Sequence, residues 1–125
     1  MSYSILVVED DPNMQILLKH ILTKAGYRVV VSENGAIAKT RLSTEPFDMV
    51  CSDVMIPGMD GIQLCTWLKK QELLKDIPFI ILSARAQVFD KELGFQAHAD
   101  AYITKPFLVQ DVLDTVQKYL VSTGC

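Results

Sequence analysis

The sequence predicts an α/β fold in which a doubly wound, five-stranded parallel sheet carries helices on both faces. Two observations lead to this class. Short apolar runs alternate along the whole chain with longer amphipathic segments, and turn residues separate them. Five runs alternating with five amphipathic segments imply right-handed crossovers, each of which places its helix against a parallel sheet.

Glycine, proline and helix-capping residues divide the chain into the expected strands and helices. Strands are expected at residues 5–8, 27–31, 47–52, 79–82 and 101–103. Helices are expected at about residues 13–25, 35–42, 61–68, 88–97 and 109–120. Gly26 ends the first helix. Ser32 or Asn34 caps the second, which Pro46 ends.

The side-chain pattern separates strands from helices. Residues 5–8 (ILVV) are a β-branched run suited to a strand buried on both faces. The first and last helices have clear amphipathic spacing. Pro57-Gly58 makes a turn, and Asp60 caps the third helix. The pattern over residues 88–97 is the weakest of the helical patterns.

Composition excludes several classes of protein. A chain of 125 residues that is 50% hydrophobic and 22% charged fits one domain, residues 1–125, with a packed core. The longest purely apolar runs are far shorter than a membrane span, and the N-terminus is not a secretion signal, so we expect a cytoplasmic protein. Cys51, Cys65 and Cys125 are expected to be reduced thiols. A net charge of -3 gives no reason to expect direct binding of nucleic acid.

Polar residues follow four of the predicted strands. They are Glu9-Asp10-Asp11, Asp53, Ser83 and Lys105. In doubly wound sheets the ligand lies beyond the carboxyl ends of the strands, so these side chains are expected on one rim. Clustered carboxylates repel one another and need a cation, and hard oxygen ligands suit Mg²⁺. With the hydroxyl of Ser83 and the ammonium of Lys105 as anion donors, the set predicts phosphoryl transfer with Asp53 as the nucleophile.

Each of these residues also has a structural interpretation. Acidic residues after a strand often serve as helix N-terminal charges, and an aspartate such as Asp53 often stabilises a turn. Ser83 alone is a helix cap, Lys105 alone is solvated surface, and Tyr102 alone is a packing residue. Only their joint placement at one rim favours a functional site.

These motifs resemble the receiver domain of two-component response regulators, from residue 5 to about residue 120. The matching segments are residues 5–11 (ILVVEDD), 53–61 (DVMIPGMDG), 83–85 (SAR) and 102–107 (YITKPF). The resemblance implies the flavodoxin-like strand order 2-1-3-4-5 and a cis peptide between Lys105 and Pro106. It also implies a signalling domain rather than an enzyme, with self-catalysed phosphotransfer and slow autodephosphorylation only.

The resemblance also implies a role for each site residue. Asp53 would accept the phosphoryl group, Lys105 and Ser83 would contact its oxygens, and Tyr102 would turn inward when Ser83 moves. The Mg²⁺ ligands would be Asp10, Asp53 and the backbone carbonyl of Met55, with Glu9 acting mainly through a metal-bound water. A histidine kinase or phosphotransfer protein would be the donor. A downstream effector or output domain would read the surface of the fourth helix, fifth strand and fifth helix.

Some positions depart from the commonest pattern of that family. Glu9 replaces a frequent aspartate, and Ser83 a frequent threonine. His98 stands where glycine is common, and would be strained at a positive φ. Met55 and Arg85 stand at the two variable positions flanking the phosphoryl group, which in that family tune the lifetime of the acyl phosphate.

Three other functions compete. A haloacid-dehalogenase-type phosphatase needs a second aspartate two residues after the nucleophile, where this chain has Met55. A flavodoxin-like cofactor binder needs a phosphate loop where Glu9-Asp10-Asp11 would repel phosphate. A receiver that serves only as an interaction module stays open. The sequence also leaves open whether the chain is a stand-alone receiver or part of a longer regulator.

Overall fold

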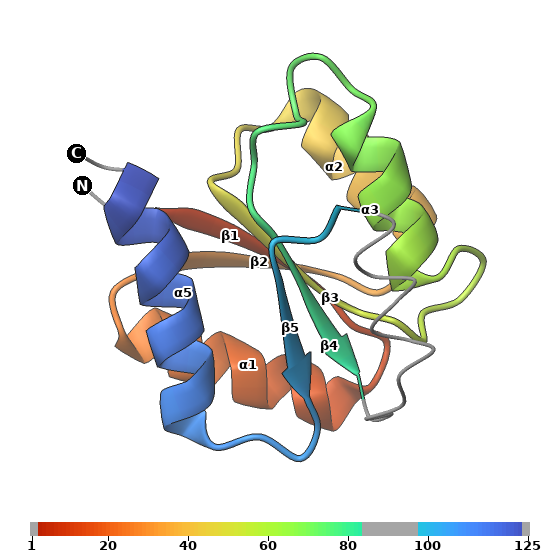
Figure 1. Cartoon of the computed structure of the whole chain (residues 1–125). Helices are drawn as coiled ribbons and strands as arrows, with labels where there is room; N and C mark the ends of the chain where they lie inside the picture. The colour runs from red at the N-terminus through yellow and green to blue at the C-terminus, as the bar shows by residue number, and fades with distance from the viewer. Residues whose placement is uncertain (1–2, 84–97, 124–125) are drawn as a thin grey trace.

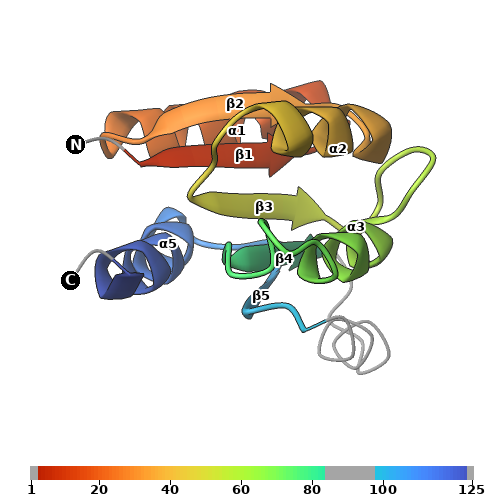
Figure 2. The ribbon, with the colours of Figure 1, turned by 90° about the horizontal axis from the view of Figure 1, so that it is seen from above.

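Five parallel strands form one sheet in the order β2-β1-β3-β4-β5. The computed structural model describes residues 3–83 and 98–123. The strands are β1 (Ser4–Val8), β2 (Arg28–Ser32), β3 (Met49–Asp53), β4 (Phe79–Ser83) and β5 (Ala101–Thr104). Figure 2 shows them side by side in this order. The predicted fold class and strand order are confirmed.

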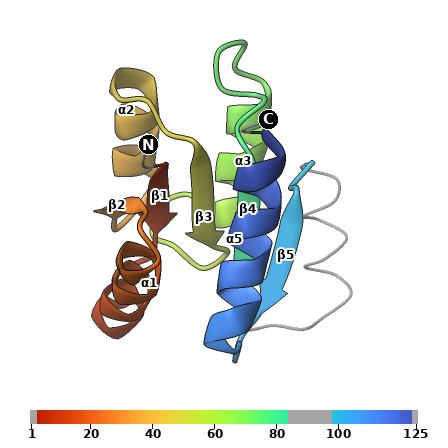
Figure 3. The same cartoon turned by 90° about the vertical axis from the view of Figure 1, so that its left-hand side faces the viewer.

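The described helices cover both faces of the sheet. They are α1 (Pro12–Lys24), α2 (Gly35–Thr44), α3 (Gly61–Lys69) and α5 (Val109–Thr123). Helices α1 and α5 lie on one face and α2 and α3 on the other (Figures 1 and 3). Two buried apolar clusters fill the two interfaces, with Leu22 and Val116 in one and Leu42 and Leu64 in the other. The expected helix over residues 88–97 lies outside the described residues, as does Arg85.

Local capping follows the sequence closely. The Asp11 carboxylate accepts from the N–H of Asn13 at 3.0 Å at the start of α1. Asn34, rather than Ser32, caps α2 and accepts from the N–H of Ile37 at 2.8 Å. Asp60 and Gln63 form a reciprocal capping box at the start of α3. No helix in residues 3–83 and 98–123 is long and apolar enough to cross a membrane.

Four strands, β2 to β5, end one residue later than the apolar pattern predicts, while β2 and β3 begin one and two residues later than expected. Asp53 pairs with Leu82, and Ser83 with Thr104, so both polar residues end a strand instead of beginning a loop. The parallel ladder continues because its hydrogen bonds are made by the backbone whatever the side chain. Asp53 and Ser83 are therefore held by the sheet itself.

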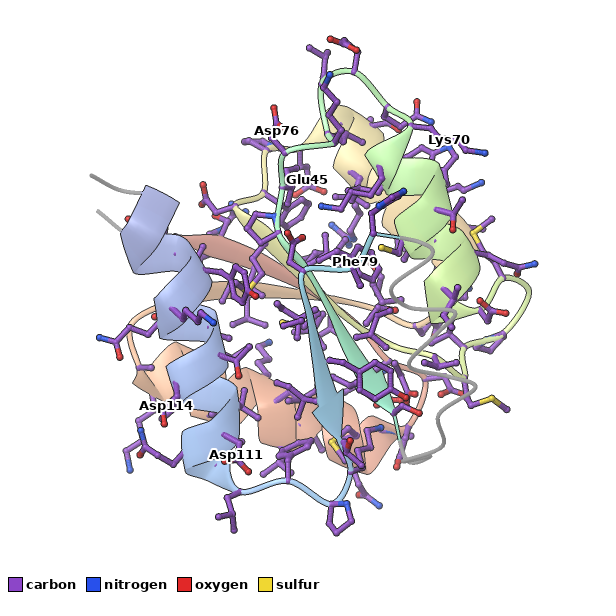
Figure 4. All side chains as sticks on the ribbon, viewed as in Figure 1. Glu45, Lys70, Asp76, Phe79, Asp111 and Asp114 are labelled. Atoms are coloured by element: carbon purple, nitrogen blue, oxygen red, sulfur yellow. The ribbon has the colours of Figure 1, made fainter. Side chains whose placement is uncertain are left out.

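Asp100 makes a network of hydrogen bonds at the amino ends of β4 and β5, opposite the carboxyl ends of the strands. Its carboxylate accepts from Phe79 N–H at 2.8 Å and from the ammonium of Lys69 at 2.8 Å. The hydroxyl of Tyr119 donates to its carbonyl at 2.6 Å. Figure 4 labels Phe79 at the start of β4 and Asp76 just before it, far from the carboxyl ends of the strands. This network links α3, β4, β5 and α5 without contributing to the rim.

Candidate functional site

Three charged side chains from distant parts of the chain meet at the carboxyl ends of the strands. The ammonium Nζ of Lys105 lies 2.6 Å from Asp53 Oδ2 and 3.0 Å from Glu9 Oε1. These residues follow or end β5, β3 and β1, which parallel pairing brings to one edge. The predicted rim is therefore a real cluster, with one cation between two carboxylates.

Glu9 is the most deeply buried of these groups, with 1% of the residue exposed. Its Oε2 accepts from the backbone N–H groups of Asp10 and Asp11 at 3.1 and 3.3 Å. Burial raises the pKa of the Glu9 carboxyl above its usual 4.5, although the hydrogen bond from Lys105 opposes the effect, and the nearby Asp53 charge raises the pKa further. With two carboxylates and one ammonium, the cluster of Glu9, Asp53 and Lys105 is short of positive charge.

Asp53 presents its two carboxylate oxygens to different donors. Oδ1 accepts from the N–H of Met55 at 3.1 Å, while Oδ2 faces Lys105. The Met55 side chain is exposed, so its backbone faces the site while its thioether points to solvent. The carboxylate is thus oriented from two sides, and the residue is buried, with 7% of its surface exposed.

The backbone of Asp53 is packed against the start of α3. A Cβ added to Gly61 would lie 2.2 Å from the Asp53 carbonyl oxygen, so only glycine fits here. The buried Ser52 hydroxyl donates to the same oxygen at 2.9 Å, and Gly61 N–H donates to Val54 O at 2.9 Å. The loop that carries Met55 is therefore closed at its base.

Lys105 is fixed by its backbone as well as its side chain. Its N–H donates to the carbonyl of Ser83 at 2.6 Å, and the predicted cis peptide to Pro106 is confirmed. Burial disfavours its charged form, but the hydrogen bonds to Asp53 and Glu9 outweigh that effect and raise the pKa of the ammonium above 10.5. Lys105 therefore stays protonated at neutral pH.

The other predicted site residues lie around this cluster. Ser83 is buried at the end of β4, and half-buried Tyr102 packs against the core on the α2–α3 side. Asp10 is exposed, next to Glu9. His98 has φ +66°, so the strained positive φ that the sequence raised as a condition is present. The structure thus joins Glu9, Asp53 and Lys105 directly and leaves the Asp10 carboxylate outside the contact.

The donor set suits a hard divalent cation. Glu9, Asp10 and Asp53 offer only oxygen donors, and Lys105 balances one of their three negative charges. Among the described residues, no three acidic, histidine or cysteine side chains already surround a common point. The residues therefore fit Mg²⁺ by chemistry and charge, while Lys105 makes the present contacts with Glu9 and Asp53.

Two contacts of the site were not foreseen from the sequence. The Gln15 side chain donates to the Glu9 carbonyl at 2.6 Å. Gly61 gives room to the Asp53 carbonyl. The only sequence signal for the first is a polar residue in the first turn of the helix after the acidic segment, and such a residue is usually solvated.

The family model of the response regulator receiver domain matches residues 5–117 of this chain. The chain belongs to the response regulator receiver family. This decides against the phosphatase and the flavodoxin-like alternatives. Receivers are signalling domains, and response regulators partner with histidine kinases and output effectors.

Curated relatives are longer than this receiver. The transcriptional regulatory protein PhoP for alkaline phosphatase synthesis in Bacillus subtilis is 38% identical over 120 residues, which are 96% of this chain and 49% of that protein. The transcriptional regulator RpaA of Synechocystis is 36% identical over 119 residues, 95% of this chain and 49% of that protein. The chain spans about half the length of these relatives.

Solved receiver structures superpose closely on this one. A putative response regulator from Chloroflexus aurantiacus has a TM-score of 0.93 at 31% identity, covering 97% of this chain and 99% of that one. The receiver domain of a sensor histidine kinase from Pseudomonas aeruginosa, solved with a magnesium ion in its active-site cleft, has a TM-score of 0.89 at 29% identity, covering 96% and 98%. The response regulator TrrA of Thermotoga maritima, in complex with Mg²⁺ and BeF, has a TM-score of 0.85 at 32% identity, covering 94% and 99%.

Proposed function

We propose that this receiver accepts a phosphoryl group on Asp53 from a histidine kinase or phosphotransfer protein, in a reaction that requires Mg²⁺. The observation that carries the proposal is the Lys105 ammonium, which contacts Glu9 and Asp53 at one rim. An ammonium beside a carboxylate nucleophile is suited to an incoming phosphoryl group, because it neutralises charge on that group's oxygens.

The transfer moves one phosphoryl group from nitrogen to oxygen. A carboxylate oxygen of Asp53 attacks the phosphorus, the bond from phosphorus to the donor's histidine nitrogen breaks, and the imidazole released takes up a proton. During this step the N–H of Met55 holds Asp53 Oδ1, and Asp53 Oδ2 is the oxygen in contact with the Lys105 ammonium. Because Lys105 stays protonated, it is able to follow a phosphoryl oxygen as the acyl phosphate forms.

The metal would be held by Asp10, Asp53 and the carbonyl of Met55, with Glu9 acting through a metal-bound water. When bound, Mg²⁺ neutralises phosphoryl oxygens and the excess carboxylate charge of the rim. The related Pseudomonas receiver, which was solved with a magnesium ion in its active-site cleft, supports a magnesium site here. With all of these groups present, we also propose that small phosphodonors phosphorylate Asp53 directly and that the acyl phosphate hydrolyses slowly by itself.

The signal leaves the site through Ser83 and Tyr102. Ser83 would hydrogen-bond a phosphoryl oxygen, and Tyr102 would move inward in response. Both belong to the β4–β5 side of the sheet, where β4 and β5 are paired. An effector protein or output domain would read the surface that includes β5 and α5, and this domain would not bind nucleic acid itself.

Incubation with acetyl phosphate, followed by intact-mass measurement, tests the proposal. The expected result is one added phosphoryl group in the presence of Mg²⁺, and none in EDTA or in Asp53→Asn. Asp76→Asn, at the opposite edge of the sheet (Figure 4), is the matched control and should be labelled like the wild type. Labelling of Asp53→Asn, or full labelling in EDTA, would show that the proposal is wrong.

A further inference from the structure

The peptide between Glu9 and Asp10 is held at both of its polar ends. Its carbonyl, that of Glu9, accepts from Gln15 Nε2 at 2.6 Å. Its N–H, that of Asp10, donates to Glu9 Oε2 at 3.1 Å. A peptide fixed at both ends cannot rotate without breaking a hydrogen bond.

Gln15 also holds the other side of Asp10. Its backbone N–H donates to the carbonyl of Asp11 at 2.9 Å, as part of the first turn of α1. The residues on either side of Asp10 are therefore both bound by Gln15, one through its side chain and one through its backbone. Gln15 therefore links α1 to the backbone on both sides of Asp10.

Asp10 itself has no comparable support. Its side chain is exposed, and within residues 3–83 and 98–123 no hydrogen bond or ion pair holds its carboxylate. The direction of its side chain therefore depends on the backbone on either side. Glu9 differs, since its carboxylate is fixed by two N–H groups and by Lys105.

We propose that Gln15 is a positioning residue for the metal site: its carboxamide holds the Glu9–Asp10 peptide so that Asp10 is presented for Mg²⁺. This inference rests on the proposed function, because it takes Asp10 as a metal ligand. Without the carboxamide donor, the peptide gains freedom that metal binding must remove again. The consequence is a lower affinity for Mg²⁺ with an unchanged site once the metal is bound.

Calorimetric titration of the unphosphorylated protein with Mg²⁺ measures this effect. Gln15→Met keeps the length of the side chain and removes its donor, and the net worth of one such hydrogen bond predicts about 3- to 10-fold weaker binding. Gln15→Ala, which suits a helix best, should show the same loss. Gln117→Met, on the exposed side of α5, is the matched control and should bind like the wild type.

Phosphorylation by acetyl phosphate separates positioning from a general loss of structure. At saturating Mg²⁺ both Gln15 variants should be labelled at the wild-type rate, whereas a damaged fold would lower that rate as well. Wild-type Mg²⁺ affinity in both variants, or an equal loss in Gln117→Met, overturns the role of Gln15 while leaving Asp53 phosphorylation intact. A wild-type protein that is phosphorylated without binding Mg²⁺ overturns the metal site and this inference together.

Discussion

Replacing Gly61 by alanine tests how closely the start of α3 is fitted to the end of β3, where Asp53 lies. The added Cβ would lie 2.2 Å from the carbonyl oxygen of Asp53 and 3.0 Å from its carbonyl carbon. Ordinary contacts between carbon and oxygen begin at about 3.3 Å, so the backbones of Gly61 and Asp53 must separate by about 1 Å. The backbone of Gly61 cannot move away from Asp53 freely, because the Gly61 N–H donates a hydrogen bond to the carbonyl of Val54.

The expected cost is about 3 kcal/mol of unfolding free energy, the upper part of the range for overpacked sites, since backbone rather than a flexible side chain must move. Urea unfolding followed by the fluorescence of Trp67, the single tryptophan, measures it. The displacement also moves Asp53 relative to Lys105, so labelling by acetyl phosphate should slow at a protein concentration and temperature where the variant is folded.

Gly58→Ala is the control for a change of glycine in the same loop. Gly58 has φ +79°, and no atom of the described residues lies within 4 Å of an added Cβ, so its substitution adds only backbone strain, about 1 to 2 kcal/mol. It should slow labelling less than Gly61→Ala. If Gly61→Ala is no less stable than Gly58→Ala and is labelled at the wild-type rate, the close fit between Gly61 and Asp53 has no role in holding the site.

Two further perturbations address charge and burial. Lys105→Met leaves the carboxylates of Glu9 and Asp53 without their shared cation, which should lower the unfolding free energy by about 3 to 5 kcal/mol at neutral pH. Added Mg²⁺ should raise the melting temperature of this variant more than that of the wild type. An equal shift in both proteins would contradict the charge argument. Burial raises the pKa of the Cys51 thiol from 9.0 to about 12, so the thiol of the unfolded chain ionises at lower pH than that of the folded protein. The contribution of the thiol to the unfolding free energy is therefore complete below about pH 9 and falls by about 1.4 kcal/mol per pH unit as the pH rises towards 12. The stability difference between wild type and Cys51→Ala should therefore shrink over this interval, whereas a constant difference would show that the folded thiol titrates normally.

Local signals in the sequence were enough for most of the fold. The apolar run of residues 5–8 and the amphipathic spacing of α1 and α5 depend on neighbours within a few residues, as do the caps made by Asn34 and Asp60. The rule that parallel strands share one carboxyl edge then brought Asp53 and Lys105 to the same rim, and the family's motifs added the cis peptide. Such features survive in a sequence because they are set by short-range chemistry.

Other features were decided only when the chain was folded. The sequence did not show that Asp53 ends a strand, since the ladder extends through backbone hydrogen bonds with β4. Nor did it show that Glu9 is buried while the neighbouring Asp10 is exposed, or that Gln15 reaches back to the Glu9 carbonyl.

The sequence by itself determined the class of sheet, the order of its elements and which residues are candidates for the site. The tertiary structure decided which of those residues touch. Lys105 and Glu9 are 96 positions apart, and their 3.0 Å contact depends on the packing of β1, β3, β4 and β5 together. The fit of Gly61 against Asp53 is likewise a matter of ångströms between segments. Patterns of residue type carry no information at that scale, because distances between remote segments are fixed only by the close packing of the whole core.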